Sequence, residues 1–200
     1  MPDWLRYPVE LIDLALAAAA LDPAAFERAS ANRAAALTVL ALPFLAGASE
    51  LLGQAYVLAA RRVSRAQAAA SLVTTGLVYV AGAVVWGAAT YALLAAARPG
   101  PPPDAAILGV VAVSYAPRVL SLLTIAPYYG EFVNRALDAW MMTCVALGLW
   151  VVVDGALWAV LACAAAGWAV SLSTRRVAGL VLGPAARRLG VITARRRPHV

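Results

Sequence analysis

The sequence contains no lysine and little charge of either sign. All sixteen basic residues are arginine, and charged residues make up 13% of the 200 positions, against about a quarter in ordinary globular proteins. Hydrophobic residues make up 64%. A water-soluble fold of this length could not bury so much apolar surface. The composition therefore excludes a soluble globular domain and predicts that hydrocarbon surrounds most of the chain.

Residues suited to catalysis or metal binding are also scarce. The single histidine is His199, in an arginine-rich tail, and the sequence has no HExxH, P-loop or GxSxG motif. Cys144 and Cys163 lie in apolar surroundings without metal-ligand spacing, which is typical of small packing residues. No histidine base accompanies the hydroxyl residues of the apolar segments. We therefore expect no enzymatic activity, no metal and no cofactor.

The first thirty residues carry acidic side chains and no basic region leading into an apolar core, so we expect no cleavable signal peptide. Residues 1–33 are instead expected to form an amphipathic arm that lies at the membrane interface. Val9 and Leu16 fall on one side of its first helix. Asp22 as a cap and Pro23 in the first turn predict the start of a second short helix.

The rest of the chain predicts an all-α, polytopic membrane helix bundle. Residues 34–172 form the expected transmembrane domain, in which Pro43 predicts a kink, and residues 173–200 form a basic C-terminal tail. The second apolar segment is longer than a bilayer requires, which predicts tilt or an overhang. The five expected transmembrane helices are 34–53, 70–97, 105–127, 132–153 and 155–172.

Small residues recur along two of these segments and predict ridges for close helix packing. Chance ridges are common in so alanine-rich a chain, so each ridge has the alternative of being no contact at all. The ridge of the fifth segment is Gly155, Ala159, Cys163 and Gly167, and that of the second is Gly76, Ala83, Gly87 and Thr90.

Arg118 is the most informative polar residue of the apolar segments, because it directly follows Pro117. The proline removes a backbone donor and disturbs the preceding turn, so we predict a broken third helix. The guanidinium can then donate to freed carbonyls, to a carboxylate or to a lipid phosphate. Glu50, with Gln54 four residues later, either pairs with Arg118 or reaches the membrane surface.

Glu131, Arg135 and Asp138 share one helix face at the start of the fourth segment, where Arg135 can reach either acid. The simpler interpretation is an ion ladder near the headgroups. The alternative is a transport or proton-relay role. If the whole chain is a small transporter, channel or lipid-moving protein, we expect a polar cavity lined by Glu50, Gln54, Ser114, Tyr115 and Arg118.

The arginines of the tail are expected to contact anionic lipid or a protein partner. Nucleic acid is not an expected partner, because the tail is tethered at a bilayer. The tail arginines are Arg175, Arg176, Arg187, Arg188, Arg195, Arg196 and Arg197.

The segment VVAVSYAPRVLSLLTIAPYYGEFVNRALDAW, which ends at Trp140, resembles the core signature of the Yip-type (Ypt/Rab-interacting) membrane proteins, bacterial branch. The shared features are the Ala-Pro-Arg run in the third span, a P-x-x-G turn from Pro127 to Gly130, and Trp140 itself. The resemblance implies a five-helix bundle without a known catalytic centre, and a scaffold role. The Rab binding of eukaryotic relatives does not carry over to bacteria, and the long arginine tail departs from the family pattern.

Together these features predict a non-catalytic scaffold or accessory subunit of a larger membrane complex, with a membrane protein or a second copy as partner. The alternative is a small transporter, channel or lipid-moving protein with a polar site around Arg118. The arginine-rich, lysine-free composition is typical of high-GC bacteria, which predicts the bacterial inner membrane. Arginine distribution favours a cytoplasmic C-terminus, whereas the family resemblance implies the reverse, so the orientation stays open.

Overall fold

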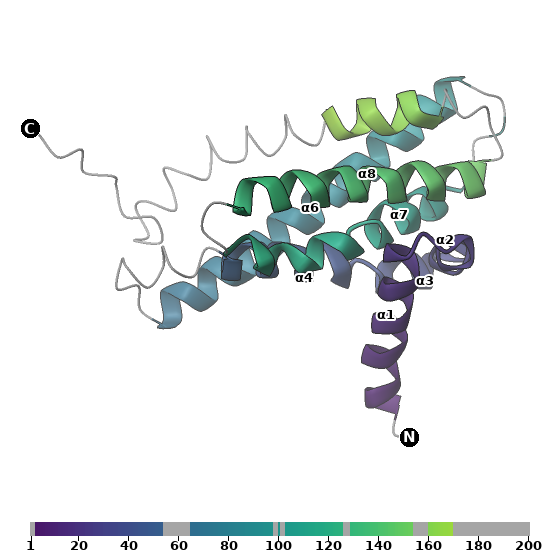
Figure 1. Cartoon of the computed structure of the whole chain (residues 1–200). Helices are drawn as coiled ribbons and strands as arrows, with labels where there is room; N and C mark the ends of the chain where they lie inside the picture. Colours follow the sequence, from purple (N-terminus) through teal and green to yellow (C-terminus); the bar gives the residue numbers. More distant parts are fainter. Residues whose placement is uncertain are drawn as a thin grey trace, which may run out of the picture.

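The structure is a computed structural model that describes residues 3–53, 65–97, 100, 103–125, 129–153 and 160–169. Within these ranges the chain is helical and contains no strand (Figure 1). The expected all-α bundle is confirmed for the described residues, and four of their helical segments are long and apolar enough to cross a membrane. They are Arg33–Gly53, Ala66–Ala97, Asp104–Thr124 and Gly130–Val153.

The fifth expected span, 155–172, is described only over Val160–Ala169. This last helix is apolar but shorter than the other four segments. The described residues therefore show four candidate crossings where the sequence predicts five. Two members of the fifth-segment ridge, Gly155 and Ala159, lie outside the described residues, as do Gln54 and all the tail arginines.

Helix α7 (Asp104–Val113) occupies the centre of the bundle. It contacts α2 (Pro23–Ser30), α3 (Arg33–Thr38), α6 (Arg65–Ala97) and α8 (Gly130–Val153). Its residues from Val110 to Val113 are fully buried. Helix α4 (Ala41–Gly53) packs on α6 and on the 3-10 helix η1 (Ala116–Ile125), and α1 (Asp3–Ala19) projects from the bundle (Figure 1). The central segment is therefore α7 followed by η1.

Helix α2 is part of the bundle, which differs from the expectation that the whole arm lies on the membrane surface. Asp22 caps α2 by accepting a hydrogen bond from the Ala24 amide at 3.0 Å, as the sequence predicts. Phe26 is fully buried. A Cβ atom at Gly109 of α7 would lie 2.2 Å from the carbonyl oxygen of Ala29. Glycine therefore allows α2 to approach α7 closely enough for Phe26 to enter the core.

The first candidate crossing is broken between α3 and α4. Pro43 has no amide hydrogen, and its ring clashes with the carbonyl of the residue four positions earlier, Val39. Helix α3 ends at Thr38, and the Leu42 amide donates to the Val39 carbonyl at 3.0 Å in a tighter i to i−3 bond. The kink predicted at Pro43 is thus confirmed and lies four residues before the proline.

The third candidate crossing breaks by the same rule. Four residues before Pro117 is Val113, the last residue of α7. The chain continues as η1, in which the Arg118 amide donates to the Tyr115 carbonyl at 2.9 Å. The Ser114 hydroxyl donates to the Val110 carbonyl at 2.7 Å. The predicted break of the third helix is confirmed, and Arg118 lies in the first turn after it.

Helix α6 has 33 residues and is therefore roughly 50 Å long, against a hydrocarbon thickness of about 30 Å. It begins at Arg65, five residues before the expected start. The small residues of its predicted ridge pack on three different elements rather than on a single partner helix. A Cβ at Gly76 would meet the Phe44 ring at 2.6 Å, and one at Gly87 would meet Leu108 at 3.4 Å.

The last helix packs on α6 at Ala164 and Gly167, which are buried. A Cβ atom at Gly167 would lie 2.5 Å from the Thr90 hydroxyl oxygen. The Trp86 indole nitrogen donates to the Ala164 carbonyl at 3.2 Å. Cys163 is half-buried beside this face. The contact surface therefore includes Gly167 of the predicted ridge, with Cys163 at its edge.

Candidate functional site

Arg118 forms the centre of a polar cluster at the start of η1. Its side chain is only 6% exposed. One terminal nitrogen, Nη1, donates to Asn134 Oδ1 at 2.6 Å and lies 3.3 Å from Asp138 Oδ1. The other, Nη2, donates to the Tyr79 hydroxyl at 3.2 Å and to Glu50 Oε2 at 3.3 Å. We call these five residues the Arg118 cluster.

The Arg118 cluster connects four elements of the bundle. Glu50 lies on α4, Tyr79 on α6, Arg118 on η1, and Asn134 and Asp138 on α8. A guanidinium presents its donors as a planar fork, which suits several acceptors around one plane. Hydrogen bonds to ionised groups are roughly twice as strong as neutral ones. The cluster therefore joins helices that are distant in the sequence.

The charges of the cluster are unequally buried. The side chains of Glu50 and Asp138 are 30% and 37% exposed, while the arginine that they share is buried. Arg118 Nε is also buried and has no hydrogen-bond partner among the described residues. The cluster thus places one enclosed cation behind two carboxylates that still reach the surface.

Ser49, the residue before Glu50, attaches α4 to the backbone of η1. Its hydroxyl donates to the Val119 carbonyl and accepts from the Leu122 amide at 2.9 Å. A Cβ atom at Gly53 would lie 2.8 Å from the Ser121 carbonyl oxygen, so the two helices are in close contact. These backbone contacts hold the carboxylate of Glu50 in register with Arg118.

Aromatic packing fixes the other side of the cluster. The Tyr115 ring lies between those of Tyr79 and Trp86, with centroid distances of 6.1 and 6.3 Å and an interplanar angle of 74° in both cases. Such edge-to-face pairs are favourable beyond their buried area. Tyr115 and Ser114 are both fully buried. They are packed core residues, which does not agree with the polar cavity that a transport role predicts for them.

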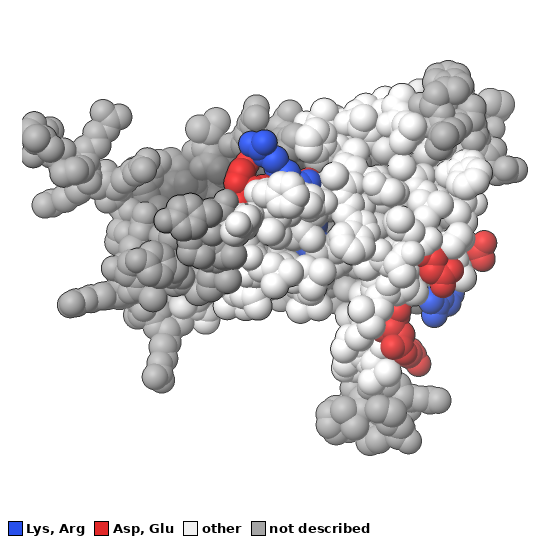
Figure 2. All heavy atoms as spheres, in the orientation of Figure 1, with Lys and Arg blue, Asp and Glu red and all other residues white. Residues whose placement is uncertain are grey.

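The predicted ladder of α8 is divided between two sites. Arg135 Nε and Glu131 Oε1 form the expected i, i+4 pair at 2.9 Å, with side chains 78% and 72% exposed. Asp138 instead pairs with Arg118. Figure 2 shows two groups of charged residues on one face of the molecule. In the first group, positively and negatively charged residues are adjacent, and the second group lies near the N-terminal helices. Uncharged residues cover the surface between the two groups.

Sequence reasoning missed three contributors to this site: Tyr79, Asn134 and Ser49. Asn134 and Asp138 are four residues apart, so they occupy one helix face and the spacing contained a signal for Asn134. No spacing indicates Tyr79 or Ser49, whose roles depend on how α4 and α6 pack. The pairing of Glu50 with Arg118, one of two alternatives left open above, is the one that the structure shows.

The described ranges contain no group of three His, Cys, Asp or Glu side chains close enough together to hold a metal ion. Comparison of the chain with known protein families, with curated proteins and with solved structures finds no match.

Proposed function

We propose that the protein is a non-catalytic integral membrane protein that acts as a scaffold or accessory subunit of a larger membrane complex. The observation that carries the proposal is the way in which the terminal nitrogens of Arg118 are bound. Both of its terminal nitrogens are occupied by acceptors from the same chain, on α4, α6 and α8. A cation enclosed in this way stabilises a helix arrangement and leaves little of its fork for a substrate.

The length of α6 supports the same proposal. About 20 Å of this helix exceeds the hydrocarbon thickness, so it must tilt or extend beyond the bilayer. Its apolar side chains Val73, Leu77 and Leu93 are exposed on the described chain. Such a helix provides a surface for another membrane protein or a second copy. The inner bacterial membrane as location and the Yip-type resemblance stay predictions that are compatible with this role.

The test is to isolate the tagged protein from its native membrane in polymer-bounded lipid discs, without a detergent step. We expect a stoichiometric membrane-protein partner, or a defined homo-oligomer, by native mass spectrometry. Arg118→Leu should reduce that assembly, because it disturbs the helix arrangement. Arg135→Leu is the matched control, since it removes an exposed arginine from the same region. A single, unpartnered chain in the discs would contradict the proposal.

A small transporter or channel is the second candidate, and one observation favours it. The partly exposed carboxylates of Glu50 and Asp138 flank a buried guanidinium whose Nε has no hydrogen-bond partner among the described residues. Proton and potassium flux into proteoliposomes tests this candidate. Flux above that of empty liposomes, and lost in Arg118→Leu, would support it. Flux equal to that of empty liposomes would remove it.

A further inference from the structure

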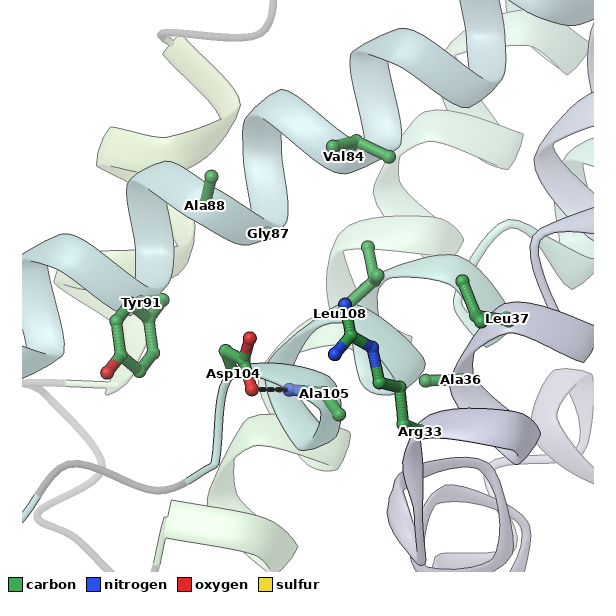
Figure 3. Close-up of a pocket in the computed structure, with 10 residues that line it drawn as sticks. All are labelled: Arg33, Ala36, Leu37, Val84, Gly87, Ala88, Tyr91, Asp104, Ala105 and Leu108. Carbon is green, nitrogen blue, oxygen red and sulfur yellow. Dashed lines mark hydrogen bonds between the residues drawn. The ribbon is translucent and has the colours of Figure 1, made fainter.

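A second polar feature lies away from the Arg118 cluster, in a pocket between α3, α6 and α7 (Figure 3). The pocket has a volume of about 340 Å³, and none of the five cluster residues lines it. This volume falls at the lower end of the range for ligand pockets, about 300–1,000 Å³. Leu37 and Val84 on its walls are exposed, so the pocket opens onto the surface.

Three polar side chains mark one end of the pocket. Arg33 and Asp104 are the first residues of two candidate crossings, Arg33–Gly53 and Asp104–Thr124, so these crossings begin at one pocket. Tyr91 also lines the pocket and lies six residues, or about 9 Å, before the end of α6. Tyrosine and arginine are typical of the headgroup region. This end of the pocket therefore lies at one membrane boundary.

The walls become apolar one or two helical turns further in. Leu37 and Leu108 each follow a charged rim residue by four positions. Val84 lies about two turns before Tyr91 along α6. All three helices thus change from polar to apolar in the same direction. This gradient matches the headgroup and acyl chain of a membrane lipid.

The rim carries one charge of each sign, and the two are not paired with each other. None of the described residues forms an ion pair with Arg33. Asp104 Oδ1 accepts a hydrogen bond from the Ala105 amide at 2.8 Å (Figure 3). A headgroup with a single charge would satisfy only one side of this rim. A headgroup with a phosphate and a primary ammonium would satisfy both, through charge-assisted hydrogen bonds.

We propose that this pocket binds one phospholipid with a phosphoethanolamine headgroup. The phosphate lies at Arg33, the ammonium at Asp104, and one acyl chain along Leu37, Leu108 and Val84. A choline headgroup has no N–H to donate to the carboxylate, and a glycerol headgroup lacks the cation. The site therefore distinguishes phosphatidylethanolamine from both. This inference does not depend on the scaffold role, because a lone chain can bind the lipid equally well.

Native mass spectrometry on the delipidated full chain in detergent tests the inference, with phosphatidylethanolamine, phosphatidylcholine and phosphatidylglycerol of identical chains as probes. We expect the ethanolamine lipid to bind at least about tenfold more tightly, the effect of one charge-assisted hydrogen bond. Asp104→Asn retains an oxygen that can accept from the Ala105 amide, and it should abolish the preference for phosphatidylethanolamine over phosphatidylcholine. Equal binding of the three lipids to the unmodified chain, or a preference that survives Asp104→Asn, would overturn the proposal.

Two further variants test the position of the lipid. Ala88 is exposed on α6 and lines the pocket, so Ala88→Phe should fill it and reduce binding about tenfold. Ala81→Phe adds the same ring to an exposed position of α6 outside the pocket and should bind as the unmodified chain does. Unfolding in SDS establishes that both variants are folded. Unchanged binding by a folded Ala88→Phe would exclude this pocket as the site.

Arg33→Gln tests the phosphate contact. Loss of the Arg33 guanidinium should weaken the binding of all three lipids, because each lipid carries a phosphate. Arg28→Gln is the control, since Arg28 is exposed on the neighbouring helix α2 and does not line the pocket. If both arginine variants weaken binding equally, the effect is one of overall charge, and the assignment of the phosphate to Arg33 is wrong.

Discussion

Replacing Arg118 by leucine should destabilise the bundle more than any other single loss of charge among the described residues. The substitution removes the donor that Glu50 and Asp138 share and leaves two carboxylates close together. It also leaves the Tyr79 hydroxyl and the Asn134 amide oxygen without this donor. Removing one partner of a buried ion pair costs more than the pair contributes, because the remaining charge is uncompensated.

The magnitude follows from the exposure of the two acids. Hydrogen bonds to charged groups contribute about 1.5–3 kcal/mol each, so two of them give about 3–6 kcal/mol. The carboxylates are about one-third exposed, and water screens that part of the interaction. We therefore expect Arg118→Leu to lower the free energy of unfolding by about 2–4 kcal/mol. The matched variant Arg135→Leu breaks a pair that is largely exposed and should cost about 0.5 kcal/mol or less.

The assay is reversible unfolding by SDS in mixed micelles, followed by tryptophan fluorescence, in a thermodynamic cycle. Glu50→Gln and Asp138→Asn, alone and with Arg118→Leu, isolate the charge term. The variant with all three changes carries no charge in the cluster, so it should recover part of the stability that Arg118→Leu loses. The reasoning is refuted if the free energy of unfolding of Arg118→Leu lies within about 0.5 kcal/mol of that of the unmodified chain. It is also refuted if the variant with all three changes is no more stable than Arg118→Leu.

Two further predictions use the same unfolding assay. Gly109→Ala places a methyl group against the backbone of α2 and should lower the free energy of unfolding by about 1–3 kcal/mol. In Gly87→Ala the new methyl group meets its nearest atoms at 3.4 Å, so this variant should be neutral or stabilising. Equal effects of the two variants would contradict the close approach of α2 and α7. Ser49→Ala leaves the Leu122 amide without its acceptor and should lower the free energy of unfolding by about 1–3 kcal/mol. The loss should be smaller for Thr143→Ala, because the hydroxyl of Thr143 is exposed. A larger loss in Thr143→Ala would show that Ser49 does not anchor η1.

The helical breaks could be predicted from the sequence because their cause is local. Pro43 and Pro117 each lack an amide hydrogen and obstruct the carbonyl four residues earlier, so the rule requires no knowledge of neighbours. Composition likewise predicts the membrane class, since solvent preference is a property of the whole chain. The position of α2 was not predictable in this way. It depends on Gly109 and on a cavity for Phe26 that exists only after α7 and α8 have packed.

The ridges of small residues illustrate the same limit. Spacing alone identifies which side of a helix permits close contact, but it does not identify the partner. The predicted ridge of α6 is in contact with Phe44 of α4, Leu108 of α7 and Gly167 of the last helix. A single continuous ridge therefore serves three neighbours, because α6 extends along the whole bundle. Only the packed arrangement distinguishes this from a two-helix seam.

Asp138 shows why the charges could be predicted individually but not as pairs. Along the sequence, Arg135 is its nearest cation and three residues away. The structure instead pairs Asp138 with Arg118, twenty residues away, and leaves Arg135 to Glu131. The reason lies in solvation: Arg135 is largely exposed and can be solvated by water or headgroups, whereas Arg118 is enclosed and has only protein acceptors. In an apolar environment the least solvated cation thus determines the pairing, and the break at Pro117 determines which cation that is.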